Sequence, residues 1–70
     1  MNELKLHSNI YSMIQVEKAA KAYRDICQIK INKNGNYIIC EFTNCFYDKN
    51  ETISEFKNYI IDLMNTDIAL

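Results

Sequence analysis

The side chains most able to carry out chemistry in this 70-residue chain are one histidine and three cysteines. His7 is the only histidine, and it alternates with Leu4 and Leu6 in the segment ELKLH. A catalytic or metal-binding imidazole needs partner groups around it, and the neighbouring residues supply none. We therefore expect His7 to face solvent, on the opposite side of a short strand from Leu4 and Leu6.

The cysteines at positions 27, 40 and 45 include no Cys-x-x-Cys pair. An odd number without the spacing of a disulfide framework is typical of free thiols in a reducing cytosol. Cys27 and Cys40 are expected on the buried side of a hairpin, where a free cysteine packs as a small apolar side chain. Cys45 falls in a loop, so a thiol enzyme acting through Cys45 is one hypothesis, although no basic residue close by would activate it. A three-cysteine zinc site would require two of its ligands to leave the core.

The carboxylates are dispersed and form no identifiable pair for general acid–base catalysis. We expect Glu41 to be a cross-strand polar partner and Asp48 and Glu55 to be turn and cap residues, and Glu51 and Asp62 are further dispersed carboxylates. The single glycine, Gly35, is used in a tight turn, which leaves no glycine-rich phosphate loop. We therefore predict no catalytic residue, no metal and no cofactor, and we interpret the chain as a protein that is not an enzyme.

Composition predicts one small globular domain spanning residues 1–70. Apolar residues make up 49% and charged residues 24% of the chain, which are globular values. Lys and Arg are spread along a chain of net charge −1, which argues against nucleic acid as a partner. No segment has the length of a membrane span, and the charged start of the chain does not read as a signal peptide, so we expect a cytoplasmic protein without a membrane partner. A domain this short buries only about 60% of its unfolded surface, which favours a partner or self-association.

The stretch from Cys27 to Thr43 organises the fold. Asn34-Gly35 is a preferred pair for the centre of a type I′ hairpin turn. A turn there predicts that Ile31 faces Ile38, that Ile29 faces Cys40 and that Cys27 faces Phe42. These apolar pairs share one face of the hairpin, and mostly polar residues occupy the other.

Two amphipathic helices are predicted to cover that apolar face. In the first, Ser12 and Gln15 have the spacing of a capping box, Gln15 lies off the apolar stripe, and the helix runs almost to Cys27. In the second, Thr52 and Glu55 have the same spacing and follow a loop over 44–50, and the tail over 65–70 is expected to fray or to dock on a partner. The result is a β-α-β-β-α order in the α+β class, with two helices on one face of a three-stranded, mostly antiparallel sheet. A right-handed crossover makes the first strand parallel to the second, and we expect the third strand between them, although the crossover rule alone leaves the neighbour of the first strand open.

Three apolar residues fall outside the core that this arrangement predicts. Tyr37 and Ile39 fall on the sheet face away from the helices, and Tyr47 lies in the loop that follows. Single apolar residues are common on protein surfaces. A sheet with one uncovered face and two open edges also offers a docking surface for a protein or for a peptide added as an extra strand. We therefore name Tyr37, Ile39 and Tyr47 as candidate partner-binding residues.

Two segments of the chain resemble a known family. The first is IYSMIQVEKAAKAYRDICQIKI, and the second, after the hairpin, is EFKNYIIDLM. The features that carry the resemblance are Tyr11, the run Lys18 to Ala20, Tyr23, Asp25, Cys27, Phe56, Asn58, Ile60, Ile61 and Asp62. Together they resemble the small HxsD-type proteins of the His-Xaa-Ser peptide-modification system, over residues 10 to 64.

The resemblance implies an accessory protein that accompanies a radical SAM maturation enzyme and binds that enzyme or its precursor peptide. The iron–sulfur cluster and the S-adenosylmethionine would then belong to the partner enzyme, since the cysteines of this chain do not match a cluster-binding spacing. Two alternatives stay open beside this reading. One is an inhibitor or regulator of the phage or plasmid type that acts by protein–protein binding, and the other is a structural module whose open faces bury each other in a homodimer.

Overall fold

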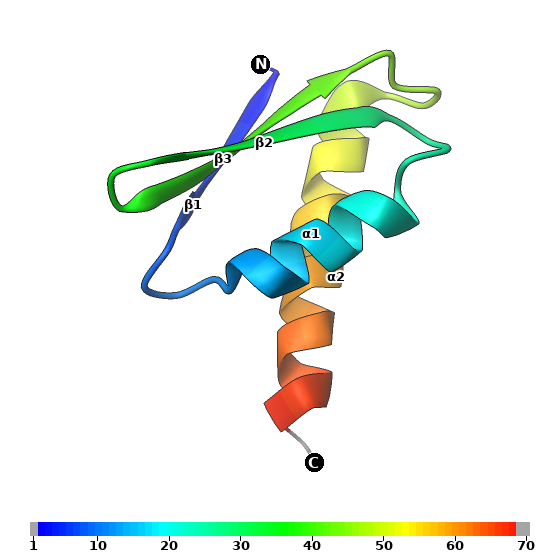
Figure 1. Ribbon diagram of the computed structural model, residues 1–70. Helices are drawn as coiled ribbons and strands as arrows, with labels where there is room; N and C mark the ends of the chain where they lie inside the picture. Colours follow the sequence, from blue (N-terminus) through cyan, green and yellow to red (C-terminus); the bar gives the residue numbers. More distant parts are fainter. Residues whose placement is uncertain (1, 69–70) are drawn as a thin grey trace.

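The computed structural model describes residues 2–68 as a three-stranded sheet with two helices on one of its faces (Figure 1). In chain order the elements are β1 (Glu3–His7), α1 (Met13–Ala22), β2 (Gln28–Asn34), β3 (Tyr37–Thr43) and α2 (Lys49–Ile68). This is the α+β class and the β-α-β-β-α order that the sequence predicts.

The sheet has the strand order β1-β3-β2, which confirms that the third strand lies between the first two. Both outer strands run antiparallel to β3 and are therefore parallel to each other. Two further backbone hydrogen bonds extend the β1–β3 ladder beyond its ends. Phe42 N–H donates to Asn2 O at 2.8 Å, and Ser8 N–H donates to Asn36 O at 2.8 Å. β3 is thus hydrogen-bonded on both sides along its length.

The hairpin turn lies one residue later than the sequence predicted. Asn34 pairs with Tyr37, so the two turn residues are Gly35 and Asn36. Gly35 has a φ of +61°, whereas Asn36 does not have a positive φ. A left-handed conformation at the first central residue alone is the type II′ pattern, for which glycine is the favoured first residue. Gly35 is therefore needed for the turn. It is the first central residue of a type II′ turn, whereas we had predicted it as the second central residue of a type I′ turn.

The later turn shifts the pairing of the two strands. Ile29 faces Phe42 and Ile31 faces Cys40, where we had predicted Cys40 and Ile38 respectively. The shift is two residues, which is one full period of a strand, so every side chain stays on its predicted face. The prediction of the apolar face of the hairpin is therefore confirmed, whereas the predicted pairing of residues across the two strands is wrong.

The first helix begins as predicted but is shorter. The Ser12 side chain makes no capping hydrogen bond, and Gln15 is buried beside Val16, so the predicted capping box does not form. The helix ends at Ala22, whereas we expected it to continue almost to the next strand.

The residues between α1 and β2 form a tight turn instead of more helix. Ile26 N–H and Cys27 N–H both donate to Tyr23 O, at 2.9 and 3.0 Å. These bonds satisfy a carbonyl that the end of the helix would leave free. The chain therefore reverses direction within a few residues and without a glycine.

The second helix begins earlier than predicted, at Lys49. Asp48 Oδ2 accepts a hydrogen bond of 3.0 Å from Glu51 N–H, which is the N-cap interaction. Thr52, which we had predicted as the cap, lies inside the helix and donates from Oγ1 to Asp48 O at 2.8 Å. The helix continues through Ile68, so the tail residues 65–68 are helical.

Both helices contribute to one core on the inner face of the sheet. Its buried apolar residues are Leu6, Val16, Ala19, Cys27, Ile38, Cys40, Phe42, Phe56 and Ile60. The Phe56 ring lies edge-on to two others, with centroids 5.2 Å from Phe42 and 5.4 Å from Tyr23. This aromatic group joins α2 to the central strand and to the end of α1. Neither helix, within the described part of the chain, has the apolar length that crossing a bilayer requires.

Candidate interaction surfaces

The outer face of the sheet, which is the face opposite the helices, carries two of the predicted partner-binding residues. Ile38 and Cys40 are buried on the inner face of β3, and Tyr37 and Ile39 alternate with them. Strand alternation therefore directs Tyr37 and Ile39 outward. The Tyr37 side chain is 45% exposed and Ile39 is partly exposed.

His7 also belongs to this face. It pairs with Tyr37 across the β1–β3 ladder, and the two ring centroids lie 5.3 Å apart in an edge-on arrangement. Asn9 N–H donates to His7 Nδ1 at 3.3 Å. His7 was predicted to face solvent, and it does lie on the solvent side of the strand, but it is half-buried against Tyr37. We call His7, Tyr37 and Ile39 the outer patch.

The edge of the sheet next to the outer patch is open. β1 pairs with β3 on one side and with no other strand among residues 2–68. Its Lys5 and His7 are the direct partners of Ile39 and Tyr37. An unpaired edge presents backbone N–H and C=O groups that another extended chain can use. The outer patch and the β1 edge therefore adjoin each other.

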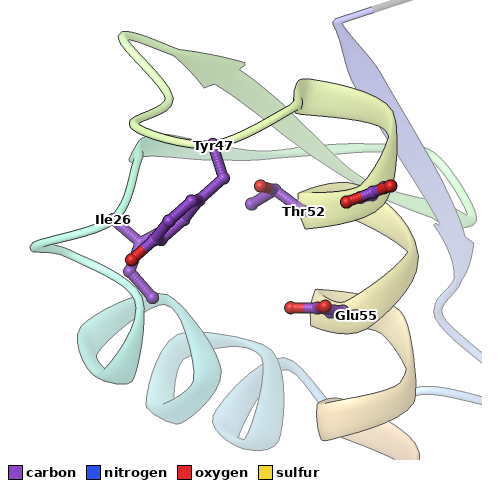
Figure 2. Close-up of a pocket in the computed structure, with 5 residues that line it drawn as sticks. Ile26, Tyr47, Thr52 and Glu55 are labelled. Atoms are coloured by element: carbon purple, nitrogen blue, oxygen red, sulfur yellow. The ribbon is translucent and has the colours of Figure 1, made fainter.

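The third predicted residue, Tyr47, is not part of the outer patch. Tyr37 begins β3, whereas Tyr47 follows the other end of that strand, roughly 20 Å away for a seven-residue strand. Figure 2 shows the Tyr47 ring lying across a hollow toward Ile26, with Thr52 and Glu55 of α2 on the other side. The structure therefore separates Tyr47 from Tyr37 and Ile39, which the sequence had grouped together.

The hollow beside Tyr47 has a volume of about 240 Å³, and Glu51 also lines it. This is below the roughly 300–1,000 Å³ of sites that enclose a small organic ligand. Two of its five lining residues, Glu51 and Glu55, carry carboxylates, and none of these five residues is Lys or Arg. The hollow could hold a single side chain.

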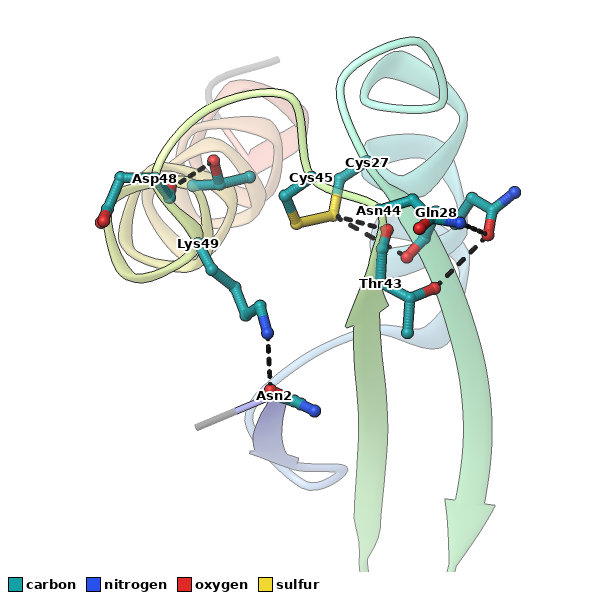
Figure 3. Close-up of a disulfide and its surroundings, with 9 residues drawn as sticks. Asn2, Cys27, Gln28, Thr43, Asn44, Cys45, Asp48 and Lys49 are labelled. Atoms are coloured by element: carbon teal, nitrogen blue, oxygen red, sulfur yellow. Dashed lines mark hydrogen bonds between the residues drawn. A yellow bond between two sulfur atoms is a disulfide. The ribbon is translucent and has the colours of Figure 1, made fainter.

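Two of the cysteines are joined by a disulfide, and the prediction of free thiols was wrong for both. Cys27 and Cys45 are linked with a Cα–Cα distance of 4.1 Å (Figure 3). In the observed register, the residue opposite position 27 is Asn44, so Cys45 comes directly beside Cys27. Asn44 has a φ of +52°, which bends the chain at the end of β3. Only Cys40 is a free cysteine, and it is buried as predicted.

The loop between β3 and α2 exposes two adjacent aromatic rings. Phe46 is 79% exposed and Tyr47 is 63% exposed, and their centroids lie 5.0 Å apart. Phe46 N–H donates to Ile26 O at 2.7 Å, which ties the loop to the segment before β2. We call residues 44–48 the aromatic loop. The sequence contained a signal for this surface, since two consecutive aromatic residues stand within an otherwise polar loop.

Burial shifts the acidity of two side chains. It raises the pKa of the Cys40 thiol to about 11, because the thiolate would have no solvent around it. Burial also raises the pKa of the Tyr23 phenol, and the negative charge of Glu55 adds to the shift. Both groups are therefore neutral at physiological pH, and the Cys40 thiol is not activated as a nucleophile.

The dispersed carboxylates have ordinary structural environments. Glu41 Oε1 accepts a 3.3 Å hydrogen bond from Asn32 Nδ2 across the β2–β3 pair, which is the cross-strand role predicted for it. Asp48 caps α2. Asp62 contacts Thr66 through its backbone carbonyl rather than its carboxylate. Within residues 2–68 there is no group of three His, Cys, Asp or Glu side chains placed to hold a metal ion.

Comparison of the chain with protein-family models, with curated proteins and with solved structures finds no match. The interpretation of its function therefore depends on the surfaces described above and on the resemblance in its sequence.

Proposed function

We propose that this chain is a non-catalytic accessory protein that holds an extended precursor peptide against the outer patch and the β1 edge. The enzyme that modifies the peptide would be a radical SAM maturase, and the chemistry would belong to that enzyme. The single observation that carries the proposal is the outer patch itself, where Tyr37 and Ile39 remain accessible on a sheet face that no described helix covers.

The shape of this surface favours an extended peptide. A peptide added beside β1 would gain backbone hydrogen bonds along the open edge of five residues. Side chains that alternate along the added strand would point to the outer face, next to His7 and Lys5. Tyr37 and Ile39 in β3 lie two strand spacings from the added strand, about 9.5 Å, so only a large apolar side chain that extends across β1 would reach them.

The chemistry of the surface also favours binding over catalysis. In the outer patch the imidazole of His7 lies edge-on to an aromatic ring and accepts a backbone hydrogen bond from Asn9. A rigid aromatic residue of this kind is typical of binding contacts. The sequence resemblance to HxsD-type proteins favours a maturation precursor as the peptide.

The test is affinity capture from the host lysate with three tagged proteins: the wild type, the double variant Tyr37→Ala/Ile39→Ser, and a matched control. The control is Ile10→Ser/Ile14→Ser, which removes two apolar side chains that are 65% and 64% exposed before and within α1. Circular dichroism first checks that all three proteins fold. Mass spectrometry then identifies what each protein retains.

We expect the wild type and the control to retain a short precursor peptide, alone or with a radical SAM enzyme, and the outer-patch variant to lose it. Equal retention by a folded outer-patch variant would contradict the proposed surface. Recovery of an unrelated enzyme would favour an inhibitor, and recovery of this chain alone would favour a homodimer.

A further inference from the structure

The disulfide between Cys27 and Cys45 is asymmetric in its exposure. Cys27 is 2% exposed and belongs to the core, whereas Cys45 is partly exposed at the start of the aromatic loop. A thiolate from solvent must approach a disulfide along the line of its two sulfur atoms. Solvent access is greater at Cys45 than at Cys27.

The surroundings of Cys27 are already suited to a reduced thiol. Its Sγ lies 3.3 Å from Thr43 O and 3.8 Å from Gln28 O (Figure 3). A disulfide sulfur carries no hydrogen, so these approaches are only contacts while the disulfide exists. After reduction, Thr43 O is close enough to accept a hydrogen bond from the S–H of Cys27. Thr43 O is therefore an available hydrogen-bond acceptor for the buried sulfur in the reduced state.

Opening the disulfide would remove few of the contacts within the core. Of the nine buried apolar residues named above, only Cys27 takes part in the disulfide. The aromatic loop would keep the hydrogen bond from Phe46 N–H to Ile26 O, and Asn44 Nδ2 would still donate to Gln28 Oε1 at 2.9 Å. The change is therefore local to the residues around Cys45.

We propose that Cys27–Cys45 is a reversible thiol-exchange site, at which a low-molecular-weight thiol attacks Cys45 and remains there as a mixed disulfide. The attacking thiol loses its proton and forms a bond to Cys45 Sγ, while the bond between Cys45 and Cys27 breaks. Cys27 leaves as a thiolate and takes up a proton, so one thiol is consumed and one is formed. A second molecule of the same thiol then releases Cys45 as a thiol and leaves as its own symmetric disulfide.

This exchange would change the aromatic loop without involving the outer patch. Tyr47 lies two residues from Cys45, Ile26 is next to Cys27, and both Tyr47 and Ile26 line the hollow. The disulfide thus joins covalently the two chain segments that carry Ile26 and Tyr47. The thiol state of the cell would then set how firmly the aromatic loop is held, at the end of the sheet opposite the outer patch.

The proposal is tested by incubating the native full chain in mixtures of reduced and oxidised glutathione, followed by acid quenching and mass spectrometry. We expect a species that carries one added glutathione, and peptide mapping should place that glutathione on Cys45. A native chain that stays disulfide-bonded at every glutathione ratio, and opens only in denaturant, would overturn the proposal. Glutathione found on Cys27 alone would overturn it as well.

Two single-cysteine replacements form a matched pair for the asymmetry. Cys27→Ala leaves Cys45 without its partner, and Cys45→Ala leaves Cys27 without its partner. With oxidised glutathione, we expect Cys45 in the first variant to react at least about tenfold faster than Cys27 in the second, because a buried sulfur is protected. Equal rates in two folded variants would contradict the proposal. Cys40→Ala serves in both backgrounds to exclude the third thiol, and if Cys27→Ala does not fold, the mapping on the wild type still decides.

Discussion

The two faces of the sheet carry alternate side chains of the same strands and differ in how deeply these side chains are buried. On β3, Ile38, Cys40 and Phe42 are buried on the inner face and hold both helices. Tyr37 and Ile39 lie on the outer face, and among the described residues no helix covers them. The comparison shows that the buried core which stabilises the fold lies on the inner face of the sheet only. Apolar residues on the other side are therefore available for a partner.

The largest expected effect is on the inner face, at Phe42. Replacing Phe42 with Ala removes a fully buried ring that contacts Phe56, and it should lower the free energy of unfolding by about 3–5 kcal/mol. A chain of this size has only several kcal/mol of total stability, so the variant should be largely unfolded at room temperature. Urea unfolding followed by circular dichroism measures the change. A loss below about 1 kcal/mol would show that the inner face is not the main support of the fold.

The next effect is a pH dependence that comes from Cys40 on the same face. Because burial raises the pKa of this thiol to about 11, the folded state resists its ionisation more than the unfolded state does. The stability from this group is complete below pH 9 and should be lost as the pH rises from 9 to 11, by about 2–3 kcal/mol. Rapid urea titrations at several pH values measure the loss. Cys40→Ala should lack this part of the pH dependence, and an unchanged alkaline slope in that variant would contradict the assignment.

The smallest expected effect on stability is on the outer face. Tyr37→Ala removes a half-exposed ring that lies in an edge-on pair with the ring of His7. An aromatic pair of this kind contributes about 0.5–1.5 kcal/mol, so the free energy of unfolding should fall by about 1 kcal/mol. The same urea titration measures it beside Phe42→Ala. A loss as large as that of Phe42→Ala would mean that Tyr37 supports the fold rather than a partner.

The elements and their faces could be predicted from the sequence because they depend on local periodicity. The alternation in β3 and the stripes of the two helices each contain several residues that agree with one another. The right-handed crossover predicted that β1 and β2 are parallel, but that rule alone left the neighbour of β1 open. None of these inferences required knowledge of an exact pairing.

The disulfide was missed because the hairpin turn was misplaced by one residue. With Asn34-Gly35 as the turn, Cys27 would face Phe42, and Cys45 would lie too far along the chain to reach it. With Gly35 and Asn36 as the turn, Cys27 comes beside Cys45. The dipeptides Asn-Gly and Gly-Asn both favour tight turns, and local propensity did not choose between them.

The contact between His7 and Tyr37 and the start of α2 were missed for related reasons. The contact depends on the register between β1 and β3, which are about thirty residues apart in the sequence and have no connecting turn to fix it. At the start of α2, Asp48-x-x-Glu51 and Thr52-x-x-Glu55 both have the spacing of a capping box. The helix uses the earlier one, because Thr52 is buried against the core.

The measurement that tests the central claim most directly is amide chemical-shift mapping of the isotope-labelled chain with the precursor peptide recovered from the lysate. If the peptide adds to the β1 edge over the outer patch, the largest shifts should fall on Lys5, His7, Tyr37 and Ile39, and α1 should be nearly unchanged. Shifts confined to the aromatic loop, or to the exposed residues of α1 and α2, would contradict the account. The uncovered face of the sheet would then not be the binding surface.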